Sequence, residues 1–398
     1  MQKTTSTKRT DNKGRILKTG ESQRTDGRYA YKYLGTDGKA KFLYSWRLND
    51  TDPIPKGKRK CKSLREMEKE ILRDKMDGIN SDGKKMTVCE LYAKQNALKP
   101  NVRKSTISGR KQLMDILKSD KLGNMSIDKV KPSDAKEWAI RLKDRFAYQT
   151  INNHKRSLKA AFYTAIEDDL IRKNPFNWNL SDVIENDTEP KIALTDEQEK
   201  ALLSFVQMDS IYSKYYRAIV ILLNTGLRIS ELCGLTTKDI DFENGFINID
   251  HQIVYDKNGY YIAPPKTENS IRQIPMLKCV RTALKEEIQS RNNVQPMLLD
   301  GCSNFIFLNQ KGYPMYASLY SGMFASLIKK YNKYNKDKLP KITPHTMRHT
   351  FCTNMANRKI TPNTLQYIMG HKNITMTLGY YTHGSAVSAK AEMEALAA

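Results

Sequence analysis

The chain has 398 residues, enough for two or three folded domains, and 39% of its residues are hydrophobic, which indicates a folded protein. No apolar run is long enough to span a membrane, and the basic N-terminal stretch lacks the apolar segment of a secretion signal. The formal net charge of +24 indicates a polyanionic partner, and nucleic acid fits better than a membrane, although a need for solubility alone is the simpler alternative.

The excess charge is concentrated near the N-terminus. Residues 1–62 contain 17 lysines and arginines against 6 acidic residues, a net charge of +11. The six cysteines are scattered and form no C-x-x-C pair, so neither a zinc site nor a disulfide framework is expected. This cysteine usage is typical of a protein of the reducing cytoplasm.

The first region, residues 1–80, is predicted to be a small sheet-plus-helix domain. Residues 1–26 are expected to be flexible, and two strand-like runs, 28–34 and 41–46, flank a hairpin turn. A capping-box sequence at Ser63–Glu66 then starts a helix.

Basic and aromatic side chains alternate in this domain. Arg28 and Lys32 lie in the first strand-like run, and Tyr44 and Trp46 lie in or beside the second. Because such mixtures are typical of nucleic-acid-binding faces, these four residues are candidate DNA contacts.

The second region, residues 84–183, is predicted to be all-α and follows a turn-rich linker. Helices are expected over residues 106–119, 133–143 and 150–168.

A cluster of basic residues lies on the last of these helices. The cluster consists of His154, Lys155, Arg156 and Lys159. It is either a DNA-facing edge or a solvated helix face, and the pattern alone leaves both alternatives open.

The third region, residues 192–398, follows a polar linker and begins with a helix capped by Thr195. Helices dominate it, an antiparallel β section interrupts them at about 246–275, and the Ala-rich end, 385–398, is expected to form a tail helix. The whole chain is therefore predicted to be a multidomain α+β protein.

The histidines are distributed unevenly, since four of the six fall in the last 54 residues. In this segment Thr343 and Pro344 are predicted to begin a helix, so that His345 and Arg348 share one face near the helix N-terminus. Two cations beside the positive end of a helix are unfavourable unless an anion binds there, although a basic surface turn is an equal alternative.

A second motif follows this helix. Gly370 is predicted to end a helix in the left-handed conformation, which places His371 at a tight corner. The next helix is expected to carry Tyr380 and Tyr381.

Two further candidates lie upstream. Arg228 occurs where one buried-looking helix ends and another begins, and Lys266 occurs at a turn in the β section. Taken singly, the arginine is more typical of a salt bridge and the lysine of a solvated surface.

Together these fragments resemble the tyrosine recombinase family of phage-type integrases. The resemblance rests on an ordered series of motifs: R-x-x-E-L (Arg228, Glu231, Leu232), a hairpin lysine (Lys266), H-x-x-R-H (His345, Arg348, His349), G-H (Gly370, His371) and a tyrosine (Tyr380 or Tyr381). The similarity is closest to the integrases of conjugative transposons and extends along nearly the whole chain.

The resemblance implies a site-specific recombinase that excises and integrates a conjugative transposon. It further implies an N-terminal arm-binding domain, an α-helical core-binding domain and a mostly α catalytic domain with a small antiparallel sheet. Double-stranded DNA at element ends and target sites, a homotetramer on two DNA segments, an excisionase and host DNA-bending proteins are the implied partners.

The resemblance also implies a role for each residue of the site. Arg228 and Arg348 would bind the phosphate, a tyrosine hydroxyl would attack it, and Lys266 would protonate the departing 5′-oxygen. His345 would help to deprotonate the tyrosine and His371 would contact the phosphate. No metal, ATP or other cofactor is expected.

The doubled tyrosine leaves the nucleophile ambiguous. Transposon-type integrases resemble T-L-x-x-Y-x-H at this point, which matches Thr377–His383 only if Tyr381 is the nucleophile. Tyr381 is therefore predicted, with Tyr380 as the alternative.

Two other activities are compatible with these residues. A type IB topoisomerase uses nearly the same chemistry, but the basic N-terminal domain and the tail favour recombination. A silenced recombinase that acts as a repressor is the non-enzymatic alternative, and the complete set of catalytic positions argues against it.

Overall fold

The computed structural model describes residues 8–35, 38–76, 85–189, 192–265, 268–291, 297–381 and 393. The chain divides into two compact units, residues 1–189 and 190–398, and each is considered by itself. Among the described residues, no helix is both long and apolar enough to cross a membrane.

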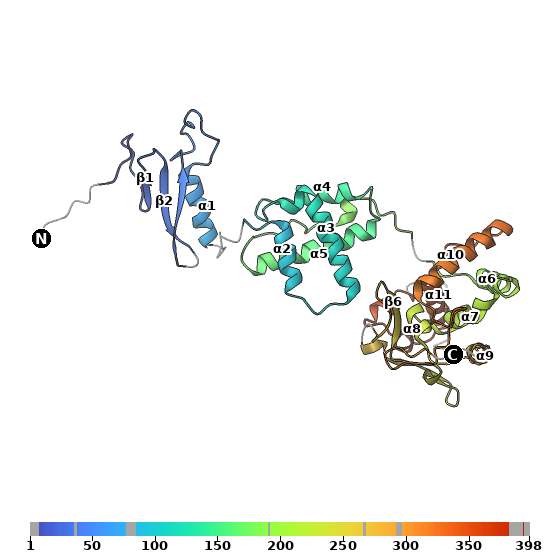
Figure 1. Ribbon diagram of the computed structural model, residues 1–398. Helices are drawn as coiled ribbons and strands as arrows, with labels where there is room; N and C mark the ends of the chain where they lie inside the picture. Colours follow the sequence, from blue (N-terminus) through green and yellow to red (C-terminus); the bar gives the residue numbers. More distant parts are fainter. Residues whose placement is uncertain are drawn as a thin grey trace. The chain divides into compact units, whose positions relative to one another are not determined.

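The N-terminal module of the first unit is a small antiparallel sheet with one helix beside it (Figure 1). Its strands are β1 (Glu21–Gln23), β2 (Tyr29–Leu34) and β3 (Ala40–Ser45), paired in that order, and its helix is α1 (Leu64–Met76). The expectation of flexibility for residues 1–26 was wrong for the described part, because β1 pairs with β2 and the Glu21 side chain is fully buried, whereas residues 1–7 lie outside the described residues.

The module has its own small core on one face of the sheet. Leu17, Tyr29, Leu48 and Leu64 are buried together there, and α1 packs against β2 and β3. Ser63 accepts a hydrogen bond from the Glu66 backbone N–H and caps α1, as its sequence predicts.

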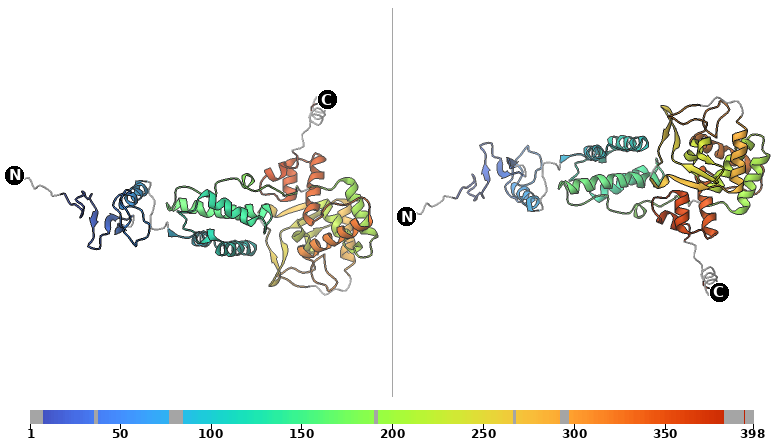
Figure 2. Two further views of the ribbon diagram at one scale, coloured as in Figure 1. Left: turned by 90° about the horizontal axis from the view of Figure 1, so that it is seen from above. Right: turned by 90° about the horizontal axis from the view of Figure 1, so that it is seen from below.

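The rest of the first unit is helical, and its helices lie side by side in a bundle (Figures 1 and 2). They are α2 (Val88–Ala97), α3 (Lys104–Ser119), α4 (Pro132–Leu142) and α5 (Tyr148–Glu167). Trp138, Phe162 and Phe176 are fully buried in their shared core. The predicted all-α character and helix positions are confirmed to within two residues.

The second unit is mostly helical. Its helices are α6 (Asp196–Met208), α7 (Tyr216–Thr225), α8 (Ile229–Gly234), α9 (Lys278–Gln289), α10 (Ala317–Tyr334), α11 (Pro344–Asn357), α12 (Pro362–Met369) and α13 (Thr375–Leu378). The tail at 385–398 lies outside the described residues, apart from Met393, so the tail helix stays a prediction.

The strands of the second unit form two small antiparallel sheets within the described residues. One has the order β4 (Ile240–Asp241), β5 (Phe246–Ile249) and β8 (Arg272–Pro275), and the other is the hairpin of β6 (Gln252–Asp256) and β7 (Gly259–Ala263). These strands confirm the predicted β section and the α+β fold class.

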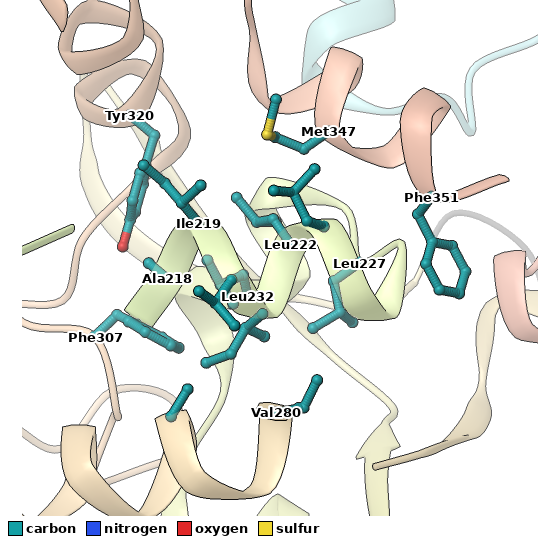
Figure 3. Packing of buried hydrophobic residues seen from close by; sticks show 14 of the residues in the cluster. Ala218, Ile219, Leu222, Leu227, Leu232, Val280, Phe307, Tyr320, Met347 and Phe351 are labelled. Carbon is teal, nitrogen blue, oxygen red and sulfur yellow. The ribbon is translucent and has the colours of Figure 1, made fainter. Parts of the chain in front are cut away.

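Helix α7 occupies the centre of the core of this unit (Figure 3). Ile219 and Leu222 on α7 are fully buried, with Val280 of α9 on one side and Met347 and Phe351 of α11 on the other. Burial of this kind fixes the end of α7, which is where the chain turns toward Arg228.

A buried carboxyl pair makes the stability of the N-terminal module depend on pH. Burial and the neighbouring Glu21 carboxylate raise the pKa of Glu68 to about 7, while Arg65 binds Glu21 at 2.9 Å. Because this pKa is higher in the folded state than in the unfolded state, protonated Glu68 stabilises the module, and that stability is lost as the pH rises through 7.

Amide hydrogen exchange of β2, corrected for intrinsic rates, should therefore be slower at pH 6 than at pH 8. Glu68→Gln should remove this difference, whereas the exposed control Glu70→Gln should retain it. Persistence of the pH dependence in Glu68→Gln would show that another group causes it.

Candidate active site and DNA-binding residues

Arg228 lies at a sharp helix-to-helix corner. Gly226 ends α7 with φ of +63°, a conformation that favours glycine, and a Cβ atom there would lie 2.5 Å from the Phe351 ring. Arg228 is the N-cap residue of α8, and its Nη1 donates to Glu231 Oε1 at 2.6 Å. The R-x-x-E spacing thus holds the guanidinium group one turn above its partner carboxylate.

The C-terminal end of α12 gathers several arginines. Arg228 Nη2 donates to the Gly370 carbonyl at 3.0 Å, and Arg348 Nη2 donates to the Met369 carbonyl. The carbonyl end of a helix carries partial negative charge and attracts cations. The two arginines, which are 120 residues apart in sequence, therefore meet beside one helix end.

Arg272, which the motifs did not include, joins the same cluster. Its Nε donates to the Ile368 carbonyl at 2.6 Å, and its Nη2 lies 2.9 Å from Glu231 Oε2. Burial alone would raise the pKa of Glu231, but the Arg272 and Arg228 guanidinium groups outweigh burial and lower it. Glu231 therefore stays ionised between two arginines.

Helix α11 carries Arg348 and His345, and it begins as predicted. Thr343 caps it by accepting from the Thr346 N–H, and Pro344 is its first residue. Arg348 is buried, and burial together with repulsion from Arg228 lowers its pKa to about 9. Its Nη1 donates to the Gly226 carbonyl at 2.5 Å, while His345 is exposed at the helix N-terminus.

His371 lies at the corner that Gly370 makes, with φ of +59° at the glycine as predicted. Burial lowers the pKa of His371 to about 4, and the charges of Arg348 and Arg228 add to the effect. The imidazole is therefore neutral at physiological pH, and its Nδ1 lies 2.9 Å from the Thr377 hydroxyl.

The two candidate tyrosines do not lie on a helix, so that expectation was wrong. Helix α13 ends at Leu378, and the two tyrosines follow it in turns. The Tyr380 N–H donates to the Thr377 carbonyl, and the Tyr381 N–H donates to the Leu378 carbonyl.

The tyrosine hydroxyls point to different partners. The Tyr380 hydroxyl lies 3.1 Å from His349 Nδ1. Burial raises the pKa of this hydroxyl, and the charge of Arg348 acts in the opposite direction. The Tyr381 hydroxyl donates to the Ile360 carbonyl at 2.6 Å. In this conformation the Tyr380 hydroxyl is directed toward the H-x-x-R-H motif, and the Tyr381 hydroxyl is held by the backbone.

Lys266 lies outside the described residues, but the residues before it are tied to α8. Gln252 of β6 donates to the Pro264 carbonyl at 3.0 Å and accepts from the Ser230 hydroxyl at 2.9 Å. Pro264 precedes Lys266 by two residues.

The four candidate DNA contacts of the N-terminal module gather on one side of its sheet. Cross-strand register puts Ala30 opposite Tyr44 and Lys32 opposite Phe42, on the face away from α1. The Arg28 guanidinium lies 5.5 Å from the Tyr44 ring centroid and 5.8 Å from that of Trp46. A cationic and aromatic face of this kind suits DNA phosphates and sugars.

The basic run on α5 is not one DNA-facing edge. Lys155 is buried, its Nζ donates to the Trp178 carbonyl, and it lies 4.6 Å from the Trp178 ring. His154 is buried edge-on against Phe146, and burial lowers its pKa. The prediction of these two as DNA contacts was wrong, since neighbouring helix residues point about 100° apart and these two turn inward.

One cluster of possible metal ligands occurs among the described residues. Asp239, Asp250 and His251 each bring a ligand atom within 4.8 Å of the others. However, His251 Nε2 lies 2.8 Å from the Gly234 carbonyl, and Asp239 accepts from Thr236 at 2.7 Å. The first contact joins the residue before β6 to the end of α8, and the second is local to the turn before β4, so both are structural bonds.

The arginine cluster is suited to bind an anion. Arg228, Arg348 and Arg272 surround the single carboxylate of Glu231, so positive charge is left in excess within the described site. A planar guanidinium group donates two parallel hydrogen bonds to phosphate oxygens.

Sequence comparisons decide the family. Residues 5–75 match the DNA-binding domain of Tn916 integrase, and residues 193–387 match the phage integrase family. The chain is 60% identical over 393 residues to the transposase of transposon Tn916 from Enterococcus faecalis and to that of Tn1545 from Streptococcus pneumoniae, covering 98% of this chain and 97% of each relative. The chain belongs to the phage integrase family.

Solved structures agree with this assignment. A fragment of the Tn1549 transposon integrase in complex with transposon right end DNA is 58% identical, with a TM-score of 0.75 over 79% of this chain and 100% of that one. A lambda integrase dimer on a core site, 14% identical with a TM-score of 0.54 over 92% of this chain and 95% of that one, shares the fold alone. The integrase is a tyrosine recombinase, so the resemblance inferred from its motifs is confirmed.

The motifs missed two parts of the integrase site, Arg272 and the His349–Tyr380 contact. Arg272 and Ile274 lie two positions apart on the buried face of β8, and a charged residue on that face of a strand was the available signal. His349 belongs to the H-x-x-R-H motif, but the motif alone does not predict its contact with Tyr380.

The inward turn of Lys155 can be tested by binding measurements. Arg156 is exposed and Lys159 is half-buried, so Arg156→Gln and Lys159→Gln should weaken DNA binding and each reduce the salt slope by about 1. Lys155→Met should lower the melting temperature but leave the salt slope unchanged. A salt slope in Lys155→Met that falls as in Arg156→Gln would contradict the burial argument.

Proposed function

We propose that this integrase excises and integrates a conjugative transposon by cutting and rejoining DNA through a 3′-phosphotyrosine intermediate. The observation that carries the proposal is the excess of guanidinium groups around Glu231 at the end of α12, two of which, those of Arg272 and Arg348, are buried. An enclosed site with uncompensated positive charge favours a phosphodiester, whose negative charge grows in the transition state.

Arg228 and Arg348 would bind the two non-bridging oxygens of the scissile phosphate. Each guanidinium group is already oriented by backbone carbonyls, so little reorganisation is needed when the phosphate arrives. The lowered pKa of Arg348 supports this role, because a bound phosphate would offset both the loss of hydration on burial and the repulsion from Arg228.

His371 and His345 would assist at the same phosphate. If Nδ1 of neutral His371 accepts a hydrogen bond from the Thr377 hydroxyl, the Nε2–H group of His371 is left to donate to a phosphate oxygen. His345, exposed at the start of α11, would take the proton of the tyrosine hydroxyl as its oxygen bonds to phosphorus.

Tyr381 is our proposed nucleophile, although its hydroxyl bonds Ile360 in the described conformation. Two variants of the solved Tn1549 integrase replace an arginine and a tyrosine that are 154 positions apart in that chain. Here Tyr381 follows Arg228 by 153 positions and Tyr380 by 152, which favours Tyr381. Release of the Ile360 bond would then have to accompany DNA binding.

Lys266 would be the general acid. When the tyrosine oxygen bonds to phosphorus, the bond to the 5′-oxygen breaks, and that oxygen takes a proton from the Lys266 ammonium group. The proposal is supported by the link from Ser230 through Gln252 to Pro264, which ties the residue two positions before Lys266 to α8.

Three domains would divide the work of DNA binding. Residues 1–80 would bind arm-type sites, residues 84–183 would bind core sites, and residues 192–398 would carry the chemistry. The family match over 5–75 and the basic aromatic face of the first sheet support the arm-binding role. Because recombination of two duplexes cuts four strands, a homotetramer would supply one nucleophile for each, in the cytoplasm where the element resides.

Substitution of each tyrosine tests the nucleophile. Tyr381→Phe should fold and bind labelled element-end DNA but form no covalent adduct, because the attacking oxygen is removed. Tyr380→Phe should keep part of its cleavage activity. Mass spectrometry of the DNA-linked peptide reads the result, and an adduct on Tyr380 would overturn the assignment.

A sulfur-containing substrate tests the general acid. Lys266→Ala should cleave normal DNA slowly, because the leaving alkoxide is not protonated. It should cleave DNA with sulfur at the bridging 5′ position much as the parent does, since a thiolate leaves without protonation. Equal losses on both substrates would assign Lys266 another role and make His345 the candidate.

A further inference from the structure

Arg272 differs from Arg228 in that it is sealed from solvent, and from the buried Arg348 in that four hydrogen bonds to protein acceptors occupy its guanidinium group. Its side chain is 0% exposed, whereas that of Arg228 is 30% exposed. The N–H groups of Arg272 bond protein acceptors at Glu231, Ser270 and Ile368. It is therefore placed to organise the site without touching DNA.

Each contact of Arg272 leads to a different part of the site. Through the Glu231 carboxylate it reaches Arg228, which shares that carboxylate. Through the Ile368 carbonyl it holds the last turn of α12, three residues before His371. The Cδ atom of Arg272 would lie 3.3 Å from a Cβ atom at Gly370, so the packing at this corner is close as well.

The shared carboxylate also determines the charge that a phosphate would meet. With Arg272 present, Glu231 is neutralised by two guanidinium groups rather than one. Without Arg272, the whole carboxylate charge would face Arg228 and draw its guanidinium group away from a phosphate. Loss of one buried cation thus acts at a distance on the residue that contacts substrate.

We propose that Arg272 is a positioning residue that fixes Glu231, and through it Arg228, against the C-terminal end of α12. This inference rests on the proposed phosphate-binding role of Arg228. A purely structural role for Arg272 makes a different prediction, since loss of stability would slow the cleavage of every substrate equally.

The test compares cleavage of two kinds of substrate by the full-length protein. One is element-end DNA with a normal scissile phosphate, and the other carries a methylphosphonate there, in each of its two diastereomers. Replacing one charged oxygen by a methyl group lessens the need for the arginine that binds that oxygen. Single-turnover rates of adduct formation and DNA affinities are measured for the parent, Arg272→Lys, Arg228→Ala and Gln273→Ala.

Arg272→Lys keeps the charge but cannot reach Glu231 and Ile368 together, so it should cleave normal DNA about 10- to 100-fold more slowly. Its DNA affinity should stay within about twofold of the parent, because many phosphates elsewhere supply affinity. The loss of cleavage rate in Arg272→Lys should be smaller on the same methylphosphonate diastereomer that reduces the loss of cleavage rate in Arg228→Ala. The control Gln273→Ala lies on the same strand as Arg272 and removes only an exposed bond to Asn248 on the neighbouring strand β5, so it should match the parent.

Two outcomes would overturn the inference alone: cleavage by Arg272→Lys at the parent rate, or a loss that is equal on all three substrates. Absence of any adduct with the parent protein would overturn the proposed function, and this inference with it. Removing Arg272 outright leaves a buried charge that can prevent folding. The double variant Glu231→Gln/Arg272→Met avoids this, and it should show the same dependence on the diastereomer.

Discussion

The site depends on the attraction between guanidinium groups and the carbonyl end of one short helix. Arg272, Arg348 and Arg228 donate to the carbonyl groups of residues 368, 369 and 370 in turn, and Glu231 holds the first and last of them. The helix end and the carboxylate are what allow several cations to be buried together. The glycine that ends the helix then places His371 beside them.

This arrangement leaves the site ready for a negative ligand. The lowered pKa values of Arg348 and His371 have the same physical cause, burial among like charges. A bound phosphate would offset that repulsion and would gain most in the transition state, when its charge is greatest. Electrostatic preorganisation therefore links the packing of the second unit to the recombination chemistry.

Features encoded by neighbouring residues could be predicted from the sequence, and features encoded by distant contacts could not. The cap at Thr343 and the left-handed Gly370 follow from local chemistry, and both are confirmed. The burial of Glu21 in β1 depends on Arg65, 44 residues away, and the role of Arg272 depends on Ile368, 96 residues away. The inward turn of Lys155 did have a local signal, because the helical spacing of Ile151, Leu158 and Phe162 puts position 155 on the buried face of α5, but its partner, the Trp178 carbonyl, could not be read from the sequence.

Thermal unfolding of the integrase with element-end DNA tests the central claim, that the arginine cluster is completed by one phosphate. Two duplexes are compared that differ only at the scissile position, with a charged phosphate in one and a neutral methylphosphonate in the other. The account predicts a clearly higher Tm for the second unit, residues 190–398, with the charged phosphate, at equal saturation of the protein by DNA. Equal Tm values with both duplexes would contradict it.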